Sequence, residues 1–165
     1  MTSQAYPKQE GLAILAAMKA TDMLQQIHDK IPLTQAMGLN VLVCSANELS
    51  LAAEFSKNKN HKGTVFGGSL STVLTLAAWA WLTNYLDEEL SYSGEISIQK
   101  GEVEYIKPVT EDFVARCFGA SSADLKSFKT TLQRRGRARL KLESKVLGEG
   151  GEVLVSFTGH YVAHP

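Results

Sequence analysis

The chain has 165 residues, a formal net charge of zero at pH 7, and 44% hydrophobic against 21% charged residues. This length and composition are typical of one soluble globular domain, and we expect residues 1–165 to form it. A chain without net charge has no overall field that attracts nucleic acid or a membrane surface, so we expect neither as a partner. The apolar stretch 12–18 is too short to span a membrane and poorly flanked for a signal peptide, which predicts a cytoplasmic location.

The two cysteines, Cys44 and Cys117, each lie in an apolar, strand-like run. We interpret both as small buried apolar residues, because a core of this size needs no disulfide. No spacing of cysteine and histidine resembles a zinc site, so no metal is expected.

The first half of the chain begins with a predicted helix over residues 9–30, which Ile31-Pro32 ends. Thr21, in the middle of this segment, is a candidate N-cap for a second helix, which would introduce a kink. Residues 40–46 and 49–56 then predict two strands joined by a tight turn, and residues 57–68 predict a polar loop that contains glycines.

The strongest periodic signal lies between residues 69 and 86. Apolar residues recur there at alternating spacings of three and one, at Leu70, Val73, Leu74, Ala77, Ala78, Trp81, Leu82 and Tyr85. Trp79 and Ala80 occupy the other side, so the helix is apolar nearly all round and is expected to be buried. Ser69 is the predicted cap of this helix, directly after Gly67 and Gly68.

The second half of the chain predicts mainly strands. Residues 95–107 form a long strand pattern whose phase changes at Lys100-Gly101, which indicates a bulge, and Pro108 closes it. Further strands are predicted over 112–119, 136–147 and 152–163, whereas 121–135 is either a helix or a long loop. Short connections favour an antiparallel sheet, so we expect an α+β fold in which one curved sheet wraps one apolar helix.

Three segments give this pattern a family resemblance. Residues 60–70 (NHKGTVFGGSL), residues 105–109 (YIKPV) and the final strand around Gly159–Val162 resemble the hot-dog fold of acyl-thioester enzymes. The resemblance covers about residues 22–164 and leaves 1–21 as an N-terminal helical extension. Within that superfamily the chain is most similar to a bacterial family of putative thioesterases that includes stand-alone malonyl-acyl-carrier-protein decarboxylases.

The resemblance implies a substrate held as a thioester on acyl carrier protein or on coenzyme A, a role in fatty acid synthesis, and a homodimer or a higher even oligomer. No separate cofactor is expected, because the substrate brings its own phosphopantetheine or coenzyme A. The family's functional asparagine aligns with Asn60, and His61 beside it either assists or is a solvated surface histidine.

The two glycines before the central helix indicate where such a substrate binds. N–H groups at a helix N-terminus have no intrahelical partner and carry the positive end of the macrodipole. Gly67 and Gly68 let a thioester carbonyl approach these groups, which would stabilise a developing oxyanion. Phe66, Ser69 and Thr75 are the expected substrate contacts. The alternative interpretation is that the glycines only allow the turn into the helix.

The central helix also bears on the type of reaction. Many hot-dog thioesterases supply an acidic residue from this helix, but residues 69–86 contain none, and Thr75 stands about where that carboxylate often lies. Decarboxylation needs no base, only stabilisation of an enolate oxygen, and Asn60 offers uncharged amide donors for it. Three alternatives stay open: Asn60 as a plain turn former, hydrolysis with Glu54, His61 or a partner's residue as base, and a non-catalytic binding module.

The last sequence feature is a basic segment over residues 126–145, which holds eight of the chain's 17 Lys and Arg residues. One interpretation is a solvated face that protects an edge strand. The other is a docking patch, with Arg134, Arg135 and Arg137 contacting the phosphates of coenzyme A or an acidic carrier protein.

Overall fold

The computed structural model describes residues 6–165, with side-chain environments from residue 11 onward. The helices are α1 (Tyr6–Lys30), the 3-10 helix η1 (Pro32–Met37), α2 (Phe55–Asn58), α3 (Gly67–Leu90) and α4 (Ser122–Arg135). The strands are β1 (Leu39–Cys44), β2 (Leu49–Ala53), β3 (Glu95–Tyr105), β4 (Phe113–Cys117), β5 (Ala138–Leu147) and β6 (Val153–His164). Within these residues, no helix is both long and apolar enough to cross a membrane.

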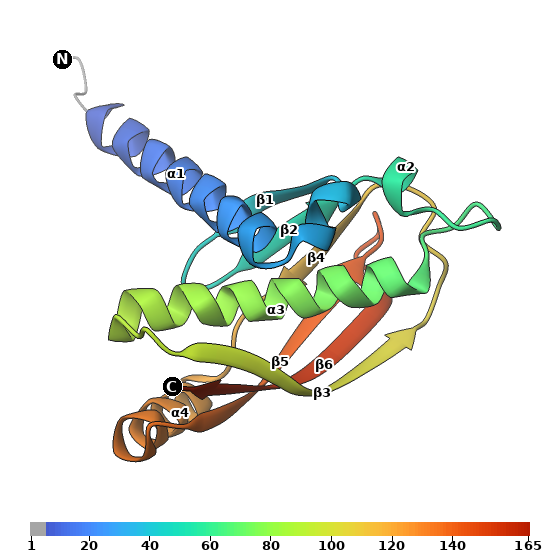
Figure 1. Ribbon diagram of the computed structural model, residues 1–165. Coiled ribbons are helices and arrows are strands. Elements are labelled where there is room, and N and C mark those ends of the chain that lie inside the picture. The colour runs from blue at the N-terminus through green and yellow to red at the C-terminus, as the bar shows by residue number, and fades with distance from the viewer. Residues whose placement is uncertain (1–5) are drawn as a thin grey trace.

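The six strands form one antiparallel sheet in the order β1-β2-β4-β5-β6-β3. The sheet curves around α3, and α4 lies at the end of the sheet where α3 ends (Figure 1). Half of the 24 residues of α3 are buried, among them Trp81. This arrangement confirms the α+β prediction of a curved sheet around an apolar helix. Strands β1 and β3 are left as the two edges of the sheet.

Strand β5 shows how the sequence pattern produces this packing. Its residues alternate between buried and exposed, with Ala138, Leu140 and Leu142 facing the core and the charged residues between them facing solvent. This period of two is the geometry of a strand covered on one face. The buried face of β5 also holds Ser144, whose hydroxyl donates to the carbonyl of Leu74 in α3 at 2.8 Å.

Helix α1 is continuous, so the expected kink at Thr21 is wrong. The Thr21 hydroxyl donates to the carbonyl of Ala17, four residues earlier, which is a bond of the helix interior and not of a cap. The C-terminal half packs on the body through the buried side chains of Met23 and Ile27. The N-terminal half projects away from the sheet (Figure 1).

Two other details differ from the sequence prediction, and one alternative that it left open is decided. Strand β2 ends at Ala53, because the next residues form α2 and not more strand. The bulge in β3 lies between Ile98 and Lys100, one residue before the predicted position. The segment left open between helix and loop is helix α4, whose N-cap Ser121 accepts a hydrogen bond from the N–H of Asp124 at 3.1 Å.

Candidate active site

The loop before α3 is a narrow hairpin and not an irregular coil. Lys59 and Val65 pair as an antiparallel bridge, and the N–H of Phe66 donates to the carbonyl of Asn58 at 2.7 Å. The N–H of Val65 donates to Val109 at 2.8 Å, which ties the hairpin to the segment after β3. The tip of the hairpin extends beyond the end of the sheet (Figure 1). The two ends of the hairpin are thus fixed at the start of α3, while its tip reaches outward.

The two asparagines of this segment have different roles. Asn58 is buried, and its Nδ2 donates to the carbonyls of Met37 at 2.8 Å and Glu54 at 2.7 Å. A buried amide with both donors used is a structural anchor. This role could not be predicted, because nothing in the sequence links Asn58 to Met37, 21 residues away.

Asn60 is half-buried and shapes the hairpin tip. Its Oδ1 accepts from the N–H groups of Lys62 at 2.8 Å and Thr64 at 3.3 Å, and its Nδ2 donates to the Thr64 hydroxyl at 2.9 Å. A backbone N–H can only donate, so these contacts fix which end of the amide is oxygen. The Nδ2 group carries a second hydrogen in addition to the one used by Thr64. The turn-forming role is therefore present, and the side chain is held in one orientation.

Helix α3 begins at Gly67 with Phe66 in the N-cap position, so the prediction that Ser69 caps the helix is wrong. Ser69 is the third residue of the first turn and is half-buried. The Phe66 ring covers Gly68, where an added Cβ would lie 2.3 Å from the ring carbon Cε1. Glycine at position 68 therefore allows the aromatic ring to pack directly on the helix backbone.

Tyr105, at the end of β3, also contacts the helix start. Its hydroxyl donates to the carbonyl of Gly67 at 2.9 Å, and its ring carbons lie 3.5 Å from the position of a Cβ on Gly67. Tyr105 belongs to the YIKPV segment but is not among the predicted site residues. The aromatic residue before Lys107-Pro108 was the only signal that pointed to it.

The start of α3 is thus a backbone surface between two aromatic rings. Phe66 is 57% exposed and Tyr105 is 54% exposed, and Gly67, Gly68 and Ser69 between them are half-buried, so this surface is partly exposed to solvent. The Phe66 side chain makes no capping hydrogen bond, and the first-turn N–H groups have no partners within the helix. A thioester oxygen placed here would meet donors and the positive end of the helix dipole.

Helix α3 has no acidic residue along its buried length. Thr75, half-buried, lies about 12 Å along the axis from Gly67, and the first carboxylate, Asp87, lies about 30 Å away. The Thr75 carbonyl accepts a hydrogen bond from the Tyr161 hydroxyl of β6 at 2.8 Å. No side chain of α3 itself supplies a general base near the helix start.

The remaining candidate bases lie outside α3. Glu54 is exposed and forms an ion pair with Lys57 at 2.9 Å. His61 is exposed at the tip of the hairpin. Among residues 6–165, no group of three or more His, Cys, Asp or Glu side chains is arranged to hold a metal ion.

Within one copy of the chain, the predicted substrate contacts Arg134, Arg135 and Arg137 lie far from the start of α3. Arg137 precedes Ala138, which pairs with Ala163 of β6, and Ala163 pairs in turn with Ile96 near the start of β3. Gly67 contacts Tyr105 at the other end of the same strand. Since β3 has 11 residues, the two places are about 33 Å apart. Arg134 and Arg135, in the last turn of α4, are exposed at the same far end as Arg137.

A sheet wrapped around an apolar helix, with an open helix start between two aromatic rings, defines the chain as a hot-dog-fold protein of the thioesterase superfamily. The chain belongs to the family described as Putative thioesterase (yiiD_Cterm), whose model matches residues 20–165. Members of this superfamily act on acyl thioesters, so acyl-carrier-protein or coenzyme A thioesters are the substrate class that the family indicates.

Solved structures agree with this family. A protein of unknown function from Chlorobaculum tepidum is 26% identical, with a TM-score of 0.82 over 90% of this chain and 96% of that chain. A putative thioesterase from Shewanella oneidensis is 27% identical, with a TM-score of 0.79 over 90% of this chain and 99% of that chain. A probable thioesterase from Pseudomonas aeruginosa, 22% identical over 87% of this chain and 95% of that chain, shares the fold with a TM-score of 0.73.

Proposed function

We propose that this protein decarboxylates a malonyl thioester, carried by acyl carrier protein or by coenzyme A, to the acetyl thioester. The observation that carries the proposal is the combination of an open start of α3 with a buried helix that has no acidic residue from 67 to 86. In this reaction the malonyl carboxylate leaves as CO2. The electron pair of the broken C–C bond forms an enolate, whose negative charge lies on the thioester oxygen, and a proton from solvent then completes the acetyl group.

The N–H groups at Gly67, Gly68 and Ser69 are the proposed donors to that oxygen. They are fixed by the helix, so they need no reorganisation as the charge develops. Asn60 is the proposed second donor, through the Nδ2 hydrogen that Thr64 does not use. The exposed Phe66 ring is the proposed contact for the acyl or pantetheine part of the substrate.

The competing function is hydrolysis of an acyl thioester, which the family description favours. Hydrolysis needs a water activated by a general base. The available groups are Glu54, already paired with Lys57, and His61, which is exposed at the hairpin tip. One is engaged in an ion pair, the other lies in solvent, and α3 itself offers no acidic residue, so we favour decarboxylation. A binding module without catalysis is the third candidate.

We also propose that the active unit is a homodimer paired through β3. This strand is an open edge of the sheet, and Ile98, Tyr105 and Ile106 on and after it are about half exposed. An edge with exposed apolar side chains needs cover. A two-fold axis that pairs β3 with its copy in antiparallel fashion brings the start of one β3 beside the end of the other. The partner's basic segment then lies at the end of the dimer where Gly67 starts its helix.

The experiment that tests the reaction is mass spectrometry of the products formed from malonyl-carrier protein and malonyl-coenzyme A. Acetyl thioester is the product expected here. Free carrier thiol would instead show that the protein hydrolyses the thioester. A substrate that binds but stays unchanged would show that the protein is a binding module without catalysis. Long-acyl thioesters provide the control, because a decarboxylase leaves them intact.

The experiment that tests the β3 dimer is analytical ultracentrifugation of the chain and of an Ile98→Glu variant. We expect the variant to have half the mass of the parent and to lose activity. A variant with the parental mass and activity would contradict pairing through β3.

A further inference from the structure

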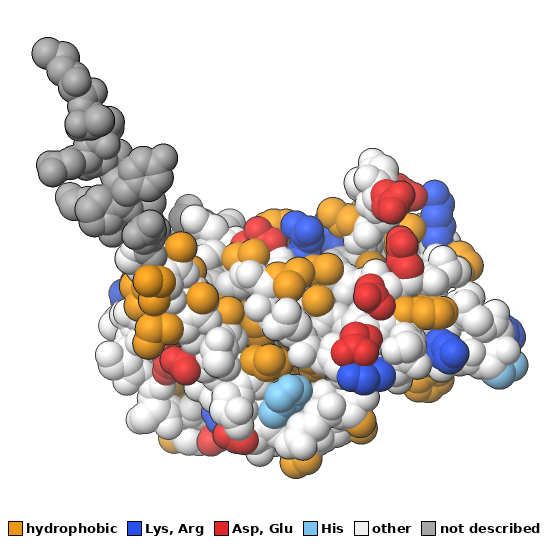
Figure 2. Space-filling model, turned by 90° about the horizontal axis from the view of Figure 1, so that it is seen from above, with side chains coloured by type: hydrophobic (Ala, Val, Ile, Leu, Met, Phe, Trp, Pro, Cys, Tyr) orange, Lys and Arg blue, Asp and Glu red, His pale blue; other side chains and the backbone are white. Residues whose placement is uncertain are grey.

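The hairpin before α3 carries a group of exposed basic side chains at its tip, which comprises residues 59–64. Lys59, His61 and Lys62 of this tip are all exposed. Figure 2 shows Lys and His side chains at the end of the molecule where the hairpin projects, with no acidic side chain beside them on this face. The sequence has no Asp or Glu between residues 55 and 86, so neither the hairpin nor the start of α3 brings an acidic side chain of its own.

The lysines of the tip differ from the neighbouring Lys57 in having no carboxylate partner. Lys57 forms an ion pair with Glu54 at 2.9 Å. Within residues 11–165, no carboxylate lies within ion-pair distance of Lys59 or Lys62. The described part of the chain therefore leaves these two positive charges available to a partner.

The tip is held in one conformation, so its charges have a defined place. The N–H of Asn60 donates to the carbonyl of Thr64 at 2.8 Å, and the N–H of Gly63 donates to the carbonyl of Asn60 at 3.2 Å. Gly63 has a φ of 74°, which glycine adopts without strain and which closes the turn. Lys59 lies opposite Val65 in the antiparallel bridge. A surface that is already ordered loses less conformational entropy when a partner binds.

The distance of the tip from the start of α3 matches the reach of a carrier-bound substrate. A phosphopantetheine arm is about as long as six extended residues, about 20 Å. Lys62 precedes Phe66 by four residues, so it lies at most about 13 Å away, and its side chain reaches a few ångströms further. A thioester bound at the start of α3 therefore brings the carrier surface around the attachment point of the arm beside the tip. Arg134, Arg135 and Arg137, about 33 Å away within one copy, lie beyond that reach.

We propose that the hairpin tip is the docking surface for an acidic acyl carrier protein. Lys59 and Lys62 form ion pairs with carboxylates of the carrier and hold it while its arm enters the start of α3. The proposal names the partner of the proposed site, so it rests on the binding of a thioester at the start of α3. It does not depend on which reaction follows there.

Coenzyme A is the less suitable partner for this surface. Small molecules such as its nucleotide are usually held in concave sites, whereas the tip projects from the body (Figure 1). Bidentate recognition of phosphate uses the planar fork of arginine, and the tip has lysines and no arginine. Separate cations on a projecting surface fit carboxylates that are spread over the surface of a protein.

Acidic residues at the same end of the molecule line a different surface. Glu111, Asp112 and Glu149 line a cavity of about 390 Å³ against β4 and β5, and no residue of the tip lines it. The Asp112 carboxylate accepts from the N–H of Phe55 at 2.7 Å. At physiological ionic strength charges are screened over about 8 Å, so the carrier responds mainly to the side chains that it touches.

The first test measures the binding of holo-acyl carrier protein, the form with a free thiol, by isothermal titration calorimetry. This probe carries no thioester, so its binding is independent of the reaction. In the full-length Lys59→Gln/Lys62→Gln variant we expect the Kd to rise about five- to tenfold, as for the loss of two exposed ion pairs. Added salt should weaken binding by the parent more than binding by the variant.

A conservative variant shows whether charge is the property that matters. Lys59→Arg/Lys62→Arg keeps both positive charges and should bind holo-carrier protein with the parental Kd. Both positions are exposed, so thermal unfolding of each double variant should match that of the parent.

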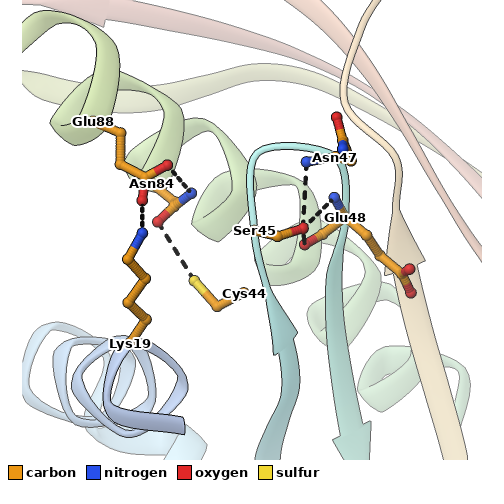
Figure 3. A network of polar contacts seen from close by, with 7 residues as sticks. All are labelled: Lys19, Cys44, Ser45, Asn47, Glu48, Asn84 and Glu88. Atoms are coloured by element: carbon orange, nitrogen blue, oxygen red, sulfur yellow. Dashed lines mark hydrogen bonds and ion pairs between the residues drawn. The ribbon is translucent and has the colours of Figure 1, made fainter. Parts of the chain in front are cut away.

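A matched control shows whether the position of the charges matters. Ala46→Glu/Asn47→Glu lowers the net charge by as much as the glutamine variant, but in the turn between β1 and β2. This turn lies near the end of α3, where the Cys44 thiol donates to Asn84 at 3.5 Å (Figure 3). Both replaced side chains are exposed, and the N–H of Asn47, which donates to the Ser45 hydroxyl at 3.3 Å, is kept. The parental Kd is expected.

The second test compares malonyl-carrier protein with malonyl-pantetheine and malonyl-coenzyme A as substrates. Lys59→Gln/Lys62→Gln should raise KM for the carrier substrate, change kcat little, and leave both small substrates nearly unaffected. An equal rise in KM for malonyl-coenzyme A would show that the lysines bind phosphates, and would overturn the proposal.

Three binding results would also overturn it: no measurable binding of holo-carrier protein by the parent, an equal Kd in the parent and the glutamine variant, or an equal loss of affinity in the control in the β1–β2 turn. Failure of the proposed reaction is a separate result. A parent that binds the carrier through the tip but forms no acetyl thioester would contradict decarboxylation and leave the docking surface in place.

Discussion

The hydroxyl of Tyr161 donates to the carbonyl of Thr75 at 2.8 Å and so joins β6 to the middle of α3. One residue earlier on the helix, Leu74 accepts from Ser144 of β5 at 2.8 Å. These are hydrogen bonds from sheet side chains to helix carbonyls that also take part in the helix ladder. Both hydroxyls are buried, so each would be costly to leave without a partner. They fix the helix relative to the sheet, and thereby the place where its first turn meets the hairpin.

We expect Tyr161→Phe to destabilise the protein by about 1 kcal/mol, because it removes one buried hydrogen bond and keeps the ring. Thermal unfolding should show a midpoint lower by about 2–4 °C. Ser144→Ala, which removes the neighbouring bond, is the matched variant and should behave alike. Midpoints that equal the parental value in both variants would mean that these contacts do not hold the helix.

The two asparagines of the hairpin segment should differ in how much stability is lost when each is replaced. Asn58→Ala leaves the carbonyls of Met37 and Glu54 without their donor, so we expect a loss of about 2–3 kcal/mol of stability. Urea unfolding measures this loss. Asn60→Ala, at the half-buried tip, should cost clearly less in the same assay. Equal losses would show that both residues are structural anchors.

For catalysis we expect Asn60→Ala to reduce malonyl decarboxylation about a hundred- to thousandfold, the usual effect of removing one oxyanion donor. Asn60→Asp should be at least as damaging. It can still accept from the N–H groups of Lys62 and Thr64, but it has no amide hydrogens and it repels the malonyl carboxylate.

Thr64→Val separates the catalytic role of Asn60 from its role in the loop. It removes the hydroxyl that Asn60 contacts and leaves the amide hydrogens intact, so its effect on rate should be much smaller than that of Asn60→Ala. If Asn60→Asp retained the parental rate while Thr64→Val matched Asn60→Ala, the asparagine would only shape the hairpin.

The basic segment should act on binding and not on the chemical step. Charge reversal at Arg134, Arg135 and Arg137 is expected to raise KM for the carrier-bound or coenzyme A substrate and to leave kcat nearly unchanged. Added salt should weaken binding by the parent and have less effect on the variant. An unchanged KM at low salt would make this segment an ordinary solvated face.

Burial in the core raises the pKa of the Cys117 thiol from 9.0 to about 11. The unfolded chain therefore loses this proton first as the pH rises, and the free energy of unfolding should fall between pH 9.0 and about 11. The part due to this thiol amounts to about 3 kcal/mol at most.

Denaturant unfolding across this pH range, in the parent and in Cys117→Ala, measures the effect. The variant should lose less stability than the parent over the window, whatever its stability at neutral pH. An equal loss of unfolding free energy in the parent and the variant would show that folding does not raise the pKa of Cys117.

Much of the fold was predictable because it depends on local periodicity. The apolar positions between Leu70 and Tyr85 indicated α3, and the alternation in residues 138–147 indicated β5, because side-chain burial repeats with the period of the backbone. The segment 121–135 was ambiguous from its polar composition. Its identity as helix α4 shows in the cap at Ser121 and in Gly136, whose φ of 65° ends the helix.

The candidate site was predictable only in part. The sequence by itself determined an apolar helix without acids, a glycine pair before it and an asparagine-bearing loop, since these are properties of neighbouring residues. Only the tertiary structure decided that Asn58 is an anchor, that Tyr105 lies on Gly67, and that the basic segment is about 33 Å from the helix start. Those relations depend on the order and register of the strands, which bring together residues far apart in the chain and separate others. That order is set by the packing of the whole sheet around α3, and no local pattern in the sequence contains it.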